Sequence, residues 1–509
     1  MRANLKIVVC FFVTTVTLAA CGGGGGGSEP AGHNSPDPKQ NPFAPLSGYK
    51  YLVAATDQSG FISFYGDNGG DKVAKLVDDT NAIITAGPYH QGQDLGSPVL
   101  GLGEVHFSKN GKKIFVVASS NVMNGATLVG GGLLVFGAET LVLQATIPMP
   151  VSKTGHPSRL VHAYLDHDGQ HVWLTNDGPS ADDPATPIDE RSQPDSIFRV
   201  NIDAADANYK KVDEVLVGDG HQGGASSFKF DQQQSARALF ATHNMSAQTI
   251  SIIDNDPSST TFLAVTNTVD LKIGGKTNIP GGMDYSLMTG KIYTGITNGA
   301  EMALSIIDTK DSNLATSSLP VGAVVDGKIP AAGFVRAVDT DEAVGRWVLT
   351  VGYKNNHGYL SVVDPTTDTV KDVIDLGDLK ASRFDYARVS GNNERHFLVF
   401  VAGTNANPAP ALAKKIAVVR IDEDSGMRPV DHQRVTLVDV DAATDERNGV
   451  MTPGNEHVYY ANGGGQCAVE PRDDSCRSIN VINVADLTVS KITTAGIGPA
   501  SIAVLTLHE

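Results

Sequence analysis

The sequence predicts an all-β protein in which one small antiparallel sheet is repeated. The first observation is an apolar strand that recurs every 51 to 64 residues and ends in aspartate. The second is that similar strands ending at Gly66 and Gly137 continue the series upstream, which makes eight units. A period of this length with one small sheet per repeat is typical of a β-propeller or a solenoid, and no long segment shows a helical period. The repeated aspartates are Asp203, Asp254, Asp308, Asp364, Asp422 and Asp486.

The two ends of the repeat region predict how a ring would close. Gly498–Leu507 has the pattern of an innermost strand with no partner after it, and Tyr49–Thr56 that of a second strand with no partner before it. Their pairing would complete the last sheet and leave no open edge. We therefore predict an eight-bladed β-propeller over residues 49–509. Seven blades remain the alternative, because the first and last units are inferred from closure.

Each unit is expected to hold hairpins. In Lys291–Asp308, the strands KIYTGIT and ALSIID flank a turn at Asn298 and Gly299. Asn110-Gly111 and Asp168-Gly169 lie between paired apolar runs in other units. Asparagine or aspartate followed by glycine suits the positive φ angles of tight hairpins. The turn chemistry therefore agrees with the strand pattern.

The N-terminus predicts export. Residues 1–21 combine Arg2 and Lys6 with the apolar run 7–13 and small residues before Cys21, which is the plan of a signal peptide. The string Leu-Ala-Ala-Cys resembles the lipobox of bacterial lipoproteins. This resemblance implies that Cys21 is acylated and becomes the mature N-terminus, and Gly22 after it implies the outer membrane. Residues 22–48, rich in glycine and proline, are expected to form a linker.

Cysteine usage and loop lengths predict two further features. Beyond Cys21, the mature chain holds Cys467 and Cys476, which we expect to form a disulfide in an oxidising compartment. The segment that contains them and the acidic segment Gly178–Asp195 both interrupt blades between a second and a third strand. Both are therefore expected on one face of the ring, where long loops on a rigid scaffold often bind partners.

Charge and motifs exclude several functions. The net charge is −17, and no basic stripe is present to meet the phosphates of a nucleic acid. The sequence also lacks the G-x-S-x-G, Walker, H-E-x-x-H and C-x-x-C-H motifs. We therefore expect a protein that binds a ligand without catalysis.

Histidine placement is the main candidate for chemistry. Three histidines come just before predicted innermost strands, and His243 and His357 lie in predicted turns on the same face. His162 lies within an innermost strand, at the position that Glu104 holds one unit earlier. Imidazoles that converge from several blades favour zinc or copper. We predict a metal site from His156, His162, His221 and His243, with Glu104 as a possible oxygen ligand. The three histidines before innermost strands are His90, His156 and His221.

Four other histidines, His167, His171, His396 and His457, are expected near the opposite face or at strand starts, in structural roles.

A family resemblance supports the fold. HVWLTNDG with DSIFRVNID, and KIYTGITNG with ALSIID, resemble the YVTN-type propeller repeat of bacterial exported proteins. GDGHQGG followed by ATHNMS is similar to blades of the superfamily that includes nitrous oxide reductase and cytochrome-cd1-like propellers. The second histidine of that motif is replaced here by Gln222, and no haem-attachment motif is present. The resemblance implies a fold rather than a reaction.

Three functional hypotheses follow from the sequence. The first is a lipid-anchored propeller on the periplasmic side of the cell envelope that binds zinc or copper at the channel mouth. The second is an interaction scaffold that holds an envelope protein on the face with the long loops. The third is a propeller enzyme, either a lactonase-like hydrolase or an oxidoreductase.

Overall fold

The computed structural model separates the chain into two units, Met1–Asn41 and Pro42–Glu509, and every described residue belongs to the second. The description covers residues 48–57, 60–76, 102–118, 122–124, 127–129, 131–141, 143–153, 158, 160–166, 169–176, 194–219, 225–229, 238–244, 247–273, 276–277, 279–286, 288–297, 302–310, 316–320, 337–340, 347–354, 357–391, 394–404, 415–427, 435–440, 449–461, 477–496 and 498–507. The predicted signal peptide, Cys21 and nearly all of the linker lie outside these residues.

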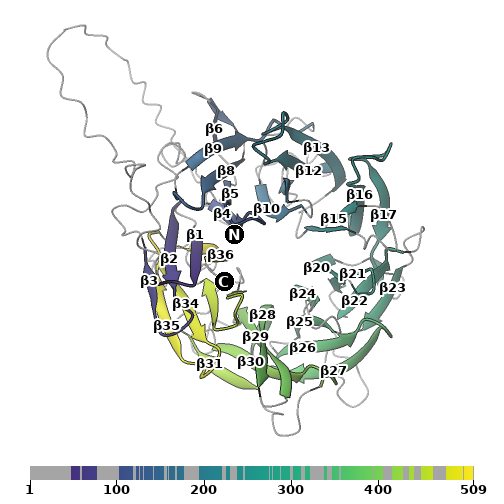
Figure 1. The fold of residues 1–509 in the computed structure, drawn as a ribbon. Helices are drawn as coiled ribbons and strands as arrows, with labels where there is room; N and C mark the ends of the chain where they lie inside the picture. The colour runs from purple at the N-terminus through teal and green to yellow at the C-terminus, as the bar shows by residue number, and fades with distance from the viewer. Residues whose placement is uncertain are drawn as a thin grey trace, which may run out of the picture. The chain divides into compact units, whose positions relative to one another are not determined.

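The unit Pro42–Glu509 is an all-β propeller of eight four-stranded antiparallel sheets around a common axis (Figure 1). The eight-bladed prediction is therefore confirmed, and the seven-bladed alternative is wrong. We number the blades 1 to 8 along the ring and give their strands from the innermost to the outermost.

Blades 1 to 4 follow the chain in order. Their strands are β4 (Leu102–Phe107), β5 (Lys113–Ala118), β8 (Gly132–Gly137) and β9 (Leu143–Pro148) in blade 1; β10 (Leu160–Leu165), β11 (His171–Asn176), β12 (Pro194–Asn201) and β13 (Val212–Asp219) in blade 2; β14 (Ala225–Lys229), β15 (Ala238–Asn244), β16 (Thr249–Asp254) and β17 (Val265–Asp270) in blade 3; and β20 (Ile279–Ser286), β21 (Lys291–Thr297), β22 (Met302–Asp308) and β23 (Thr316–Pro320) in blade 4.

Blades 5 to 8 complete the ring. Their strands are β24 (Ala337–Thr340), β25 (Val348–Lys354), β26 (His357–Asp364) and β27 (Thr369–Asp375) in blade 5; β28 (Lys380–Gly391), β29 (Glu394–Thr404), β30 (Lys415–Asp422) and β31 (Thr436–Asp439) in blade 6; β32 (Gly449–Met451), β33 (His457–Ala461), β34 (Ser478–Asn483) and β35 (Val489–Thr493) in blade 7; and β36 (Pro499–Thr506), β1 (Tyr51–Asp57), β2 (Ile62–Asp67) and β3 (Val73–Lys75) in blade 8.

Two short hairpins, which the sequence did not predict, lie between regular strands. One is formed by β6 (Val122–Asn124) and β7 (Thr127–Val129), and the other by β18 (Lys272–Ile273) and β19 (Lys276–Thr277).

Blade 8 joins the two ends of the described chain. Strand β36 pairs antiparallel with β1, with Thr506 opposite Tyr51 and Ile502 opposite Ala55. The predicted closure is confirmed. The innermost strand of blade 8 therefore comes from the C-terminal end of the chain. With this strand in place, β1 has no unpaired edge that could pair with another chain.

Every blade buries both of its faces against its neighbours. In β5, Ile114 and Val116 pack toward blade 8, whereas Phe115 and Val117 pack toward blade 2. Successive side chains of a strand point to opposite faces, so a strand buried on both sides needs an unbroken apolar run. Eight separate apolar clusters result, one between each pair of adjacent blades.

The repeated aspartates build turns. Asp254, Asp308, Asp364 and Asp422 end the third strand of their blades, and each side chain accepts a backbone N–H two residues further on. This is the local hydrogen bond by which aspartate stabilises a turn.

The predicted repeat needs correction at three places. Asn201, Asn483 and Asp67 make this turn contact at the ends of β12, β34 and β2. Asp203 and Asp486 lie two and three residues beyond their strands, and Gly66 precedes the strand end. Asparagine makes the same hydrogen bond as aspartate. A search for aspartate alone therefore selected Asp203 and Asp486 instead of Asn201 and Asn483.

Both long insertions join second and third strands, as predicted: residues 177–193 connect β11 to β12, and 462–477 connect β33 to β34, with Arg477 the one described residue of these connections. The rest of both insertions, including Cys467 and Cys476, lies outside the described residues.

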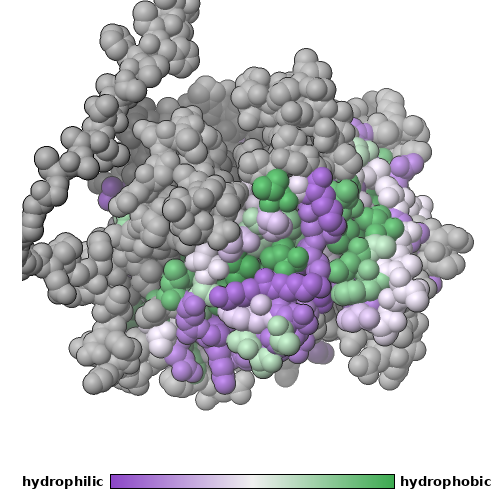
Figure 2. Space-filling model, turned by 90° about the horizontal axis from the view of Figure 1, so that it is seen from above, coloured by the Kyte–Doolittle hydropathy of each residue, from purple (hydrophilic) through white to green (hydrophobic). Residues whose placement is uncertain are grey.

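The exposed large apolar side chains are scattered over several blades. Examples are Leu143 on β9, Leu216 on β13 and Leu437 on β31. Figure 2 shows hydrophilic and hydrophobic residues mixed on the side of the molecule that it presents. Single exposed apolar residues are normal for a protein surface. In the part of the chain that the structure describes, no helix is long and apolar enough to cross a membrane.

Polar side chains also tie neighbouring blades together. Between blades 7 and 8, buried Asp67 accepts hydrogen bonds from His457 Nδ1 (2.9 Å) and from the Tyr459 hydroxyl. The structural role predicted for His457 is confirmed. The hydrogen bond to Asp67 raises the pKa of His457, against the lowering effect of burial.

Asp385 on β28 makes the corresponding tie between blades 6 and 7. Its carboxylate accepts the backbone N–H groups of Met451 (2.7 Å) and Tyr386 (2.8 Å). Burial nevertheless raises the pKa of Asp385 from 3.8 to about 6. Two backbone donors therefore do not fully replace the water that the carboxylate loses.

This raised pKa predicts a stability that depends on pH. The contribution of Asp385 is fully present below pH 3.8 and is lost as the pH rises through about 6. Asp385→Asn keeps an oxygen acceptor without a charge. In wild type we expect the protonated Asp385 to make the free energy of unfolding about 3 kcal/mol larger at about pH 3 than at about pH 7. In Asp385→Asn this difference should be absent, as measured by urea unfolding at both pH values.

The matched control is Asp439→Asn, an exposed carboxylate on β31 of the same blade. An equal effect of the two substitutions on the pH dependence would contradict this account of Asp385.

Candidate functional site

The innermost strands of blades 1 and 2 share a local irregularity. In β4 the register with β5 shifts between Leu102 and Val105, and in β10 the register with β11 shifts between Leu160 and Ala163. Each shift inserts one extra residue, which is a β-bulge, and bulges re-aim side chains. Glu104 and His162 are the residues just before the regular register resumes. The sequence alignment of these two positions is therefore confirmed.

Two hydrogen bonds, one within blade 2 and one between blades 1 and 2, hold the bulge of β10 in place. Thr175 Oγ1 on β11 accepts the backbone N–H of His162 at 3.0 Å. Glu104 Oε2 accepts the backbone N–H of Ala163 at 2.6 Å. Because β4 and β10 are adjacent around the ring axis (Figure 1), the Glu104 carboxylate bridges the two blades.

Glu104 also binds two imidazoles. Its Oε1 lies 2.8 Å from His162 Nδ1, and its Oε2 lies 3.4 Å from His106 Nε2. The exposed fractions of the side chains are 17% for Glu104, 20% for His162 and 34% for His106. We call these three residues the axial cluster. The carboxylate lies deepest, and both rings reach partly into solvent.

The charge of Glu104 is stabilised by this arrangement. Burial alone would raise its pKa, but the charge of His162 and the hydrogen bonds from both histidines hold the pKa well below its usual value of 4.5. Glu104 is therefore an anion at neutral pH.

An ionised carboxylate can only accept hydrogen bonds, so the ring nitrogens facing Glu104 carry protons. In the neutral rings this leaves His162 Nε2 and His106 Nδ1 as the nitrogens with lone pairs. No described residue makes a hydrogen bond to either of these two nitrogens. A histidine that donates one N–H to a carboxylate and presents its other nitrogen is the usual arrangement of a metal-binding imidazole.

The structure separates His243 from this cluster. The sequence placed His243 in a turn, but it lies inside β15, is fully buried, and its Nε2 is 2.8 Å from Thr294 Oγ1. It belongs to the interface of blades 3 and 4, whereas His162 belongs to that of blades 1 and 2. The turn prediction failed because β15 continues through His243 to Asn244.

The other candidates are resolved only in part. His156 and His221 lie outside the described residues, as does His90. His357 starts β26, is half exposed, and lies 3.5 Å from Asp375 and 3.4 Å from Asp378. Among the residues that the structure describes, no group of three histidine, cysteine or acidic side chains forms a ready metal site.

His106 was missed by the sequence reasoning. The signal was present, since His106 lies two residues after Glu104 in the same strand, and alternate residues share a face. The prediction considered histidines before innermost strands, in turns and at the position equivalent to Glu104, and did not weigh the strand residues next to Glu104 itself.

Comparisons with known proteins were made at three levels. No protein-family model matches the chain, and no curated protein matches it. The predicted YVTN-type and cytochrome-cd1-like membership therefore stays a prediction.

Similar solved structures include a putative 6-phosphogluconolactonase from Bacteroides uniformis ATCC 8492, with a TM-score of 0.44, 11% identity, and coverage of 77% of this chain and 100% of that chain. The periplasmic gluconolactonase PpgL of Pseudomonas aeruginosa has a TM-score of 0.45 and 11% identity over 90% of this chain and 99% of its own. Apo AztD from Citrobacter koseri has a TM-score of 0.45 and 12% identity over 89% and 98%. At this level of similarity the comparisons carry no functional argument.

The role of Glu104 predicts a specific stability profile. Its lowered pKa means that its contribution is present above pH 4.5 and is lost as the pH falls below that value. We expect Glu104→Ala to destabilise the protein at neutral pH by about 1–3 kcal/mol, because the N–H of Ala163 loses its acceptor. Glu104→Gln retains an acceptor, so its unfolding free energy should change less between about pH 7 and about pH 3 than that of wild type.

Urea unfolding of the three proteins at both pH values provides the measurement. A Gln variant with the full acid sensitivity of wild type would show that Glu104 is not the group responsible.

Proposed function

We propose that this protein is a binding propeller of the bacterial cell envelope and that its axial cluster binds a transition-metal ion, zinc or copper. The observation that carries the proposal is the pair of imidazoles oriented by one buried carboxylate. Neutral imidazole nitrogen is a preferred ligand of both metals. His162 Nε2 and His106 Nδ1 would be the ligands.

In this proposal Glu104 has a different role from the oxygen ligand that the sequence suggested. Its oxygens already accept hydrogen bonds from Ala163, His162 and His106. It therefore orients the imidazoles from the second coordination shell. The bulge of β10, held by Thr175 and Glu104, supplies a firm base for the His162 ring. The sequence predicts His156 and His221 as the remaining ligands.

Metal binding is tested on protein purified without a histidine tag, dialysed against zinc or copper, and measured by elemental analysis. We expect about one ion per chain in wild type and a loss of bound metal in His162→Ala and His106→Ala. Glu104→Gln should weaken binding by about 10- to 100-fold, as substitutions of orienting carboxylates do.

His357→Ala is the control, because His357 is a half-exposed histidine in blade 5, away from the axial cluster. Wild type without stoichiometric metal, or His162→Ala with wild-type binding, would refute the proposal.

A second function is favoured by the same pair of side chains. A carboxylate that orients a histidine is also the arrangement of a general base, so the Glu104–His162 pair could activate water in a lactonase-like hydrolase. Hydrolysis of a simple lactone by metal-free protein, abolished in His162→Ala, would favour this reading over metal carriage.

The location is part of the proposal. A lipid anchor on Cys21 would hold the propeller at the periplasmic side, with residues 22–48 as a tether. We expect wild type to fractionate with membranes and Cys21→Ser to be released into the soluble fraction, because it lacks the acylated thiol. Equal fractionation of the two proteins on immunoblots would reject the anchor without affecting the metal site.

A further inference from the structure

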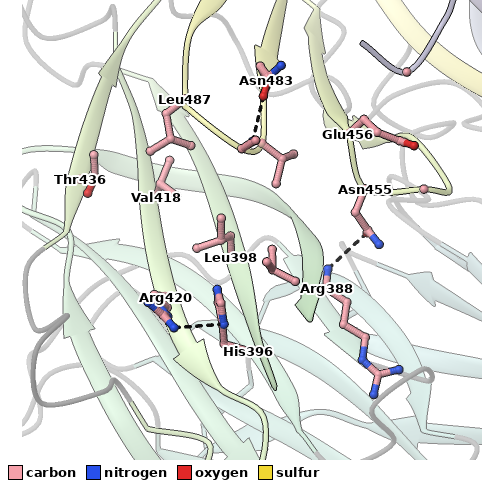
Figure 3. A pocket seen from close by; sticks show the side chains of 15 residues that line it. Arg388, His396, Leu398, Val418, Arg420, Thr436, Asn455, Glu456, Asn483 and Leu487 are labelled. Carbon is pink, nitrogen blue, oxygen red and sulfur yellow. Dashed lines mark hydrogen bonds between the residues drawn. The ribbon is translucent and has the colours of Figure 1, made fainter. Parts of the chain in front are cut away.

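A pocket of about 660 Å³ lies between blades 6 and 7 (Figure 3). It is near the turns that join first to second strands, at the opposite end of the blades from the long insertions. The first hairpin of blade 6 explains it: β28 continues to Gly391, paired with Glu394, whereas β32 of blade 7 ends at Met451, level with Asp385. Blade 6 therefore extends past its neighbour and forms a wall.

Hydrogen bonds between the blades make this pocket rigid. Asn455, in the left-handed region with φ 62°, accepts the backbone N–H of Arg388 through its Oδ1 at 3.2 Å. Glu456 accepts hydrogen bonds from Lys50 Nζ at 2.5 Å and from the Tyr51 hydroxyl at 2.8 Å. The turn of blade 7 is thus held against both neighbouring blades. A ligand would meet walls that are already in place.

The polar end of the pocket is rich in hydrogen-bond donors. Arg388 is held by Glu423, with Nη2 2.5 Å from Oε1 and Nε 3.1 Å from Oε2. Arg420 Nη2 donates to His396 Nδ1 at 3.2 Å. A guanidinium cannot accept, so His396 is the acceptor at Nδ1 and its neutral ring carries the proton on Nε2. His396, assigned a structural role from the sequence, is therefore a further donor in the pocket.

The charges of the lining favour an anion. Arg420 brings a positive charge, whereas the charge of Arg388 is paired with Glu423, and Glu456 is the one carboxylate among the described lining residues. Lys50 neutralises Glu456. Arginine is well suited to carboxylate and phosphate because its planar fork makes two parallel hydrogen bonds.

The pocket also has an apolar part, beside the polar lining residues Thr436, Asn455 and Asn483. Aliphatic side chains lie between Arg420 and Asn483, as Figure 3 shows for Leu398, Val418 and Leu487. Small-molecule sites combine apolar surface with a few convergent polar groups, and the volume falls within their usual range of about 300–1,000 Å³.

We propose that this interblade pocket binds a small organic anion with an apolar body and a carboxylate or phosphate head. The head lies at Arg420 and His396, and the body lies on the aliphatic side chains. This site is separate from the axial cluster, since it lies between different blades and uses none of the same residues.

The test is isothermal titration calorimetry of the full-length chain, with octanoate, octyl phosphate and octanol as probes. We expect one octanoate per chain and binding at least about tenfold weaker for octanol, which keeps the body and lacks the charge. Whichever anion binds more tightly, octanoate or octyl phosphate, identifies the head group. Arg420→Met should weaken binding of that anion at least about tenfold.

Arg477→Met is the matched control, because it removes the same charge at an exposed position next to β34, away from the pocket. Arg420→Lys keeps the positive charge but lacks the planar guanidinium, so it should bind the anion with intermediate affinity. This variant tests the role of Arg420 even if Arg420→Met does not fold. The proposal is overturned if no anion binds at millimolar concentration, if octanol binds as tightly as octanoate, or if both Arg420 variants bind like wild type. Chelator treatment should leave anion binding unchanged, so failure of the metal proposal would be distinguishable.

Discussion

The burial of every blade between two neighbours is the constraint on which this structure depends. A four-stranded sheet with apolar side chains on both faces cannot be stable alone in water, because about 25 cal/mol for each Å² of apolar surface would be lost. Eight apolar clusters, one per interface, satisfy all the blades only if the ring is complete. The pairing of β36 with β1 completes it, so the two ends of the propeller are as central to its stability as any interior strand.

Hydrogen bonds between polar side chains also join the blades. They differ in whether the side chains that they hold remain exposed to solvent. Asp67 and His457 satisfy each other in a fully buried contact and have a structural role. Glu104 makes a similar bridge, but the imidazoles that it holds are partly exposed around the ring axis. The same device, a carboxylate that joins two blades, can therefore serve stability alone or also orient a binding group. The difference is the position of the contact along the radius of the ring.

Two kinds of site arise from two kinds of irregularity. The bulges in β4 and β10 turn Glu104 and His162 toward each other near the axis. The first hairpin of blade 6, which extends past β32 of blade 7, leaves a pocket at the opposite end of the blades, where Arg420 and His396 lie. A perfectly regular propeller would have neither feature. The ring supplies rigidity, and departures from its repeat supply chemistry.

The sequence by itself determined the all-β class, the eight units and the pairing that closes them, because strand periodicity and turn residues are local signals repeated many times. It also placed Glu104 and His162 at equivalent positions of adjacent blades. Only the tertiary structure decided that His106 completes that cluster, that His243 is buried against Thr294 in another interface, and that His396 lines a pocket. The physical reason is that contacts between blades depend on bulges, strand lengths and side-chain orientation, none of which leaves a periodic mark in the sequence.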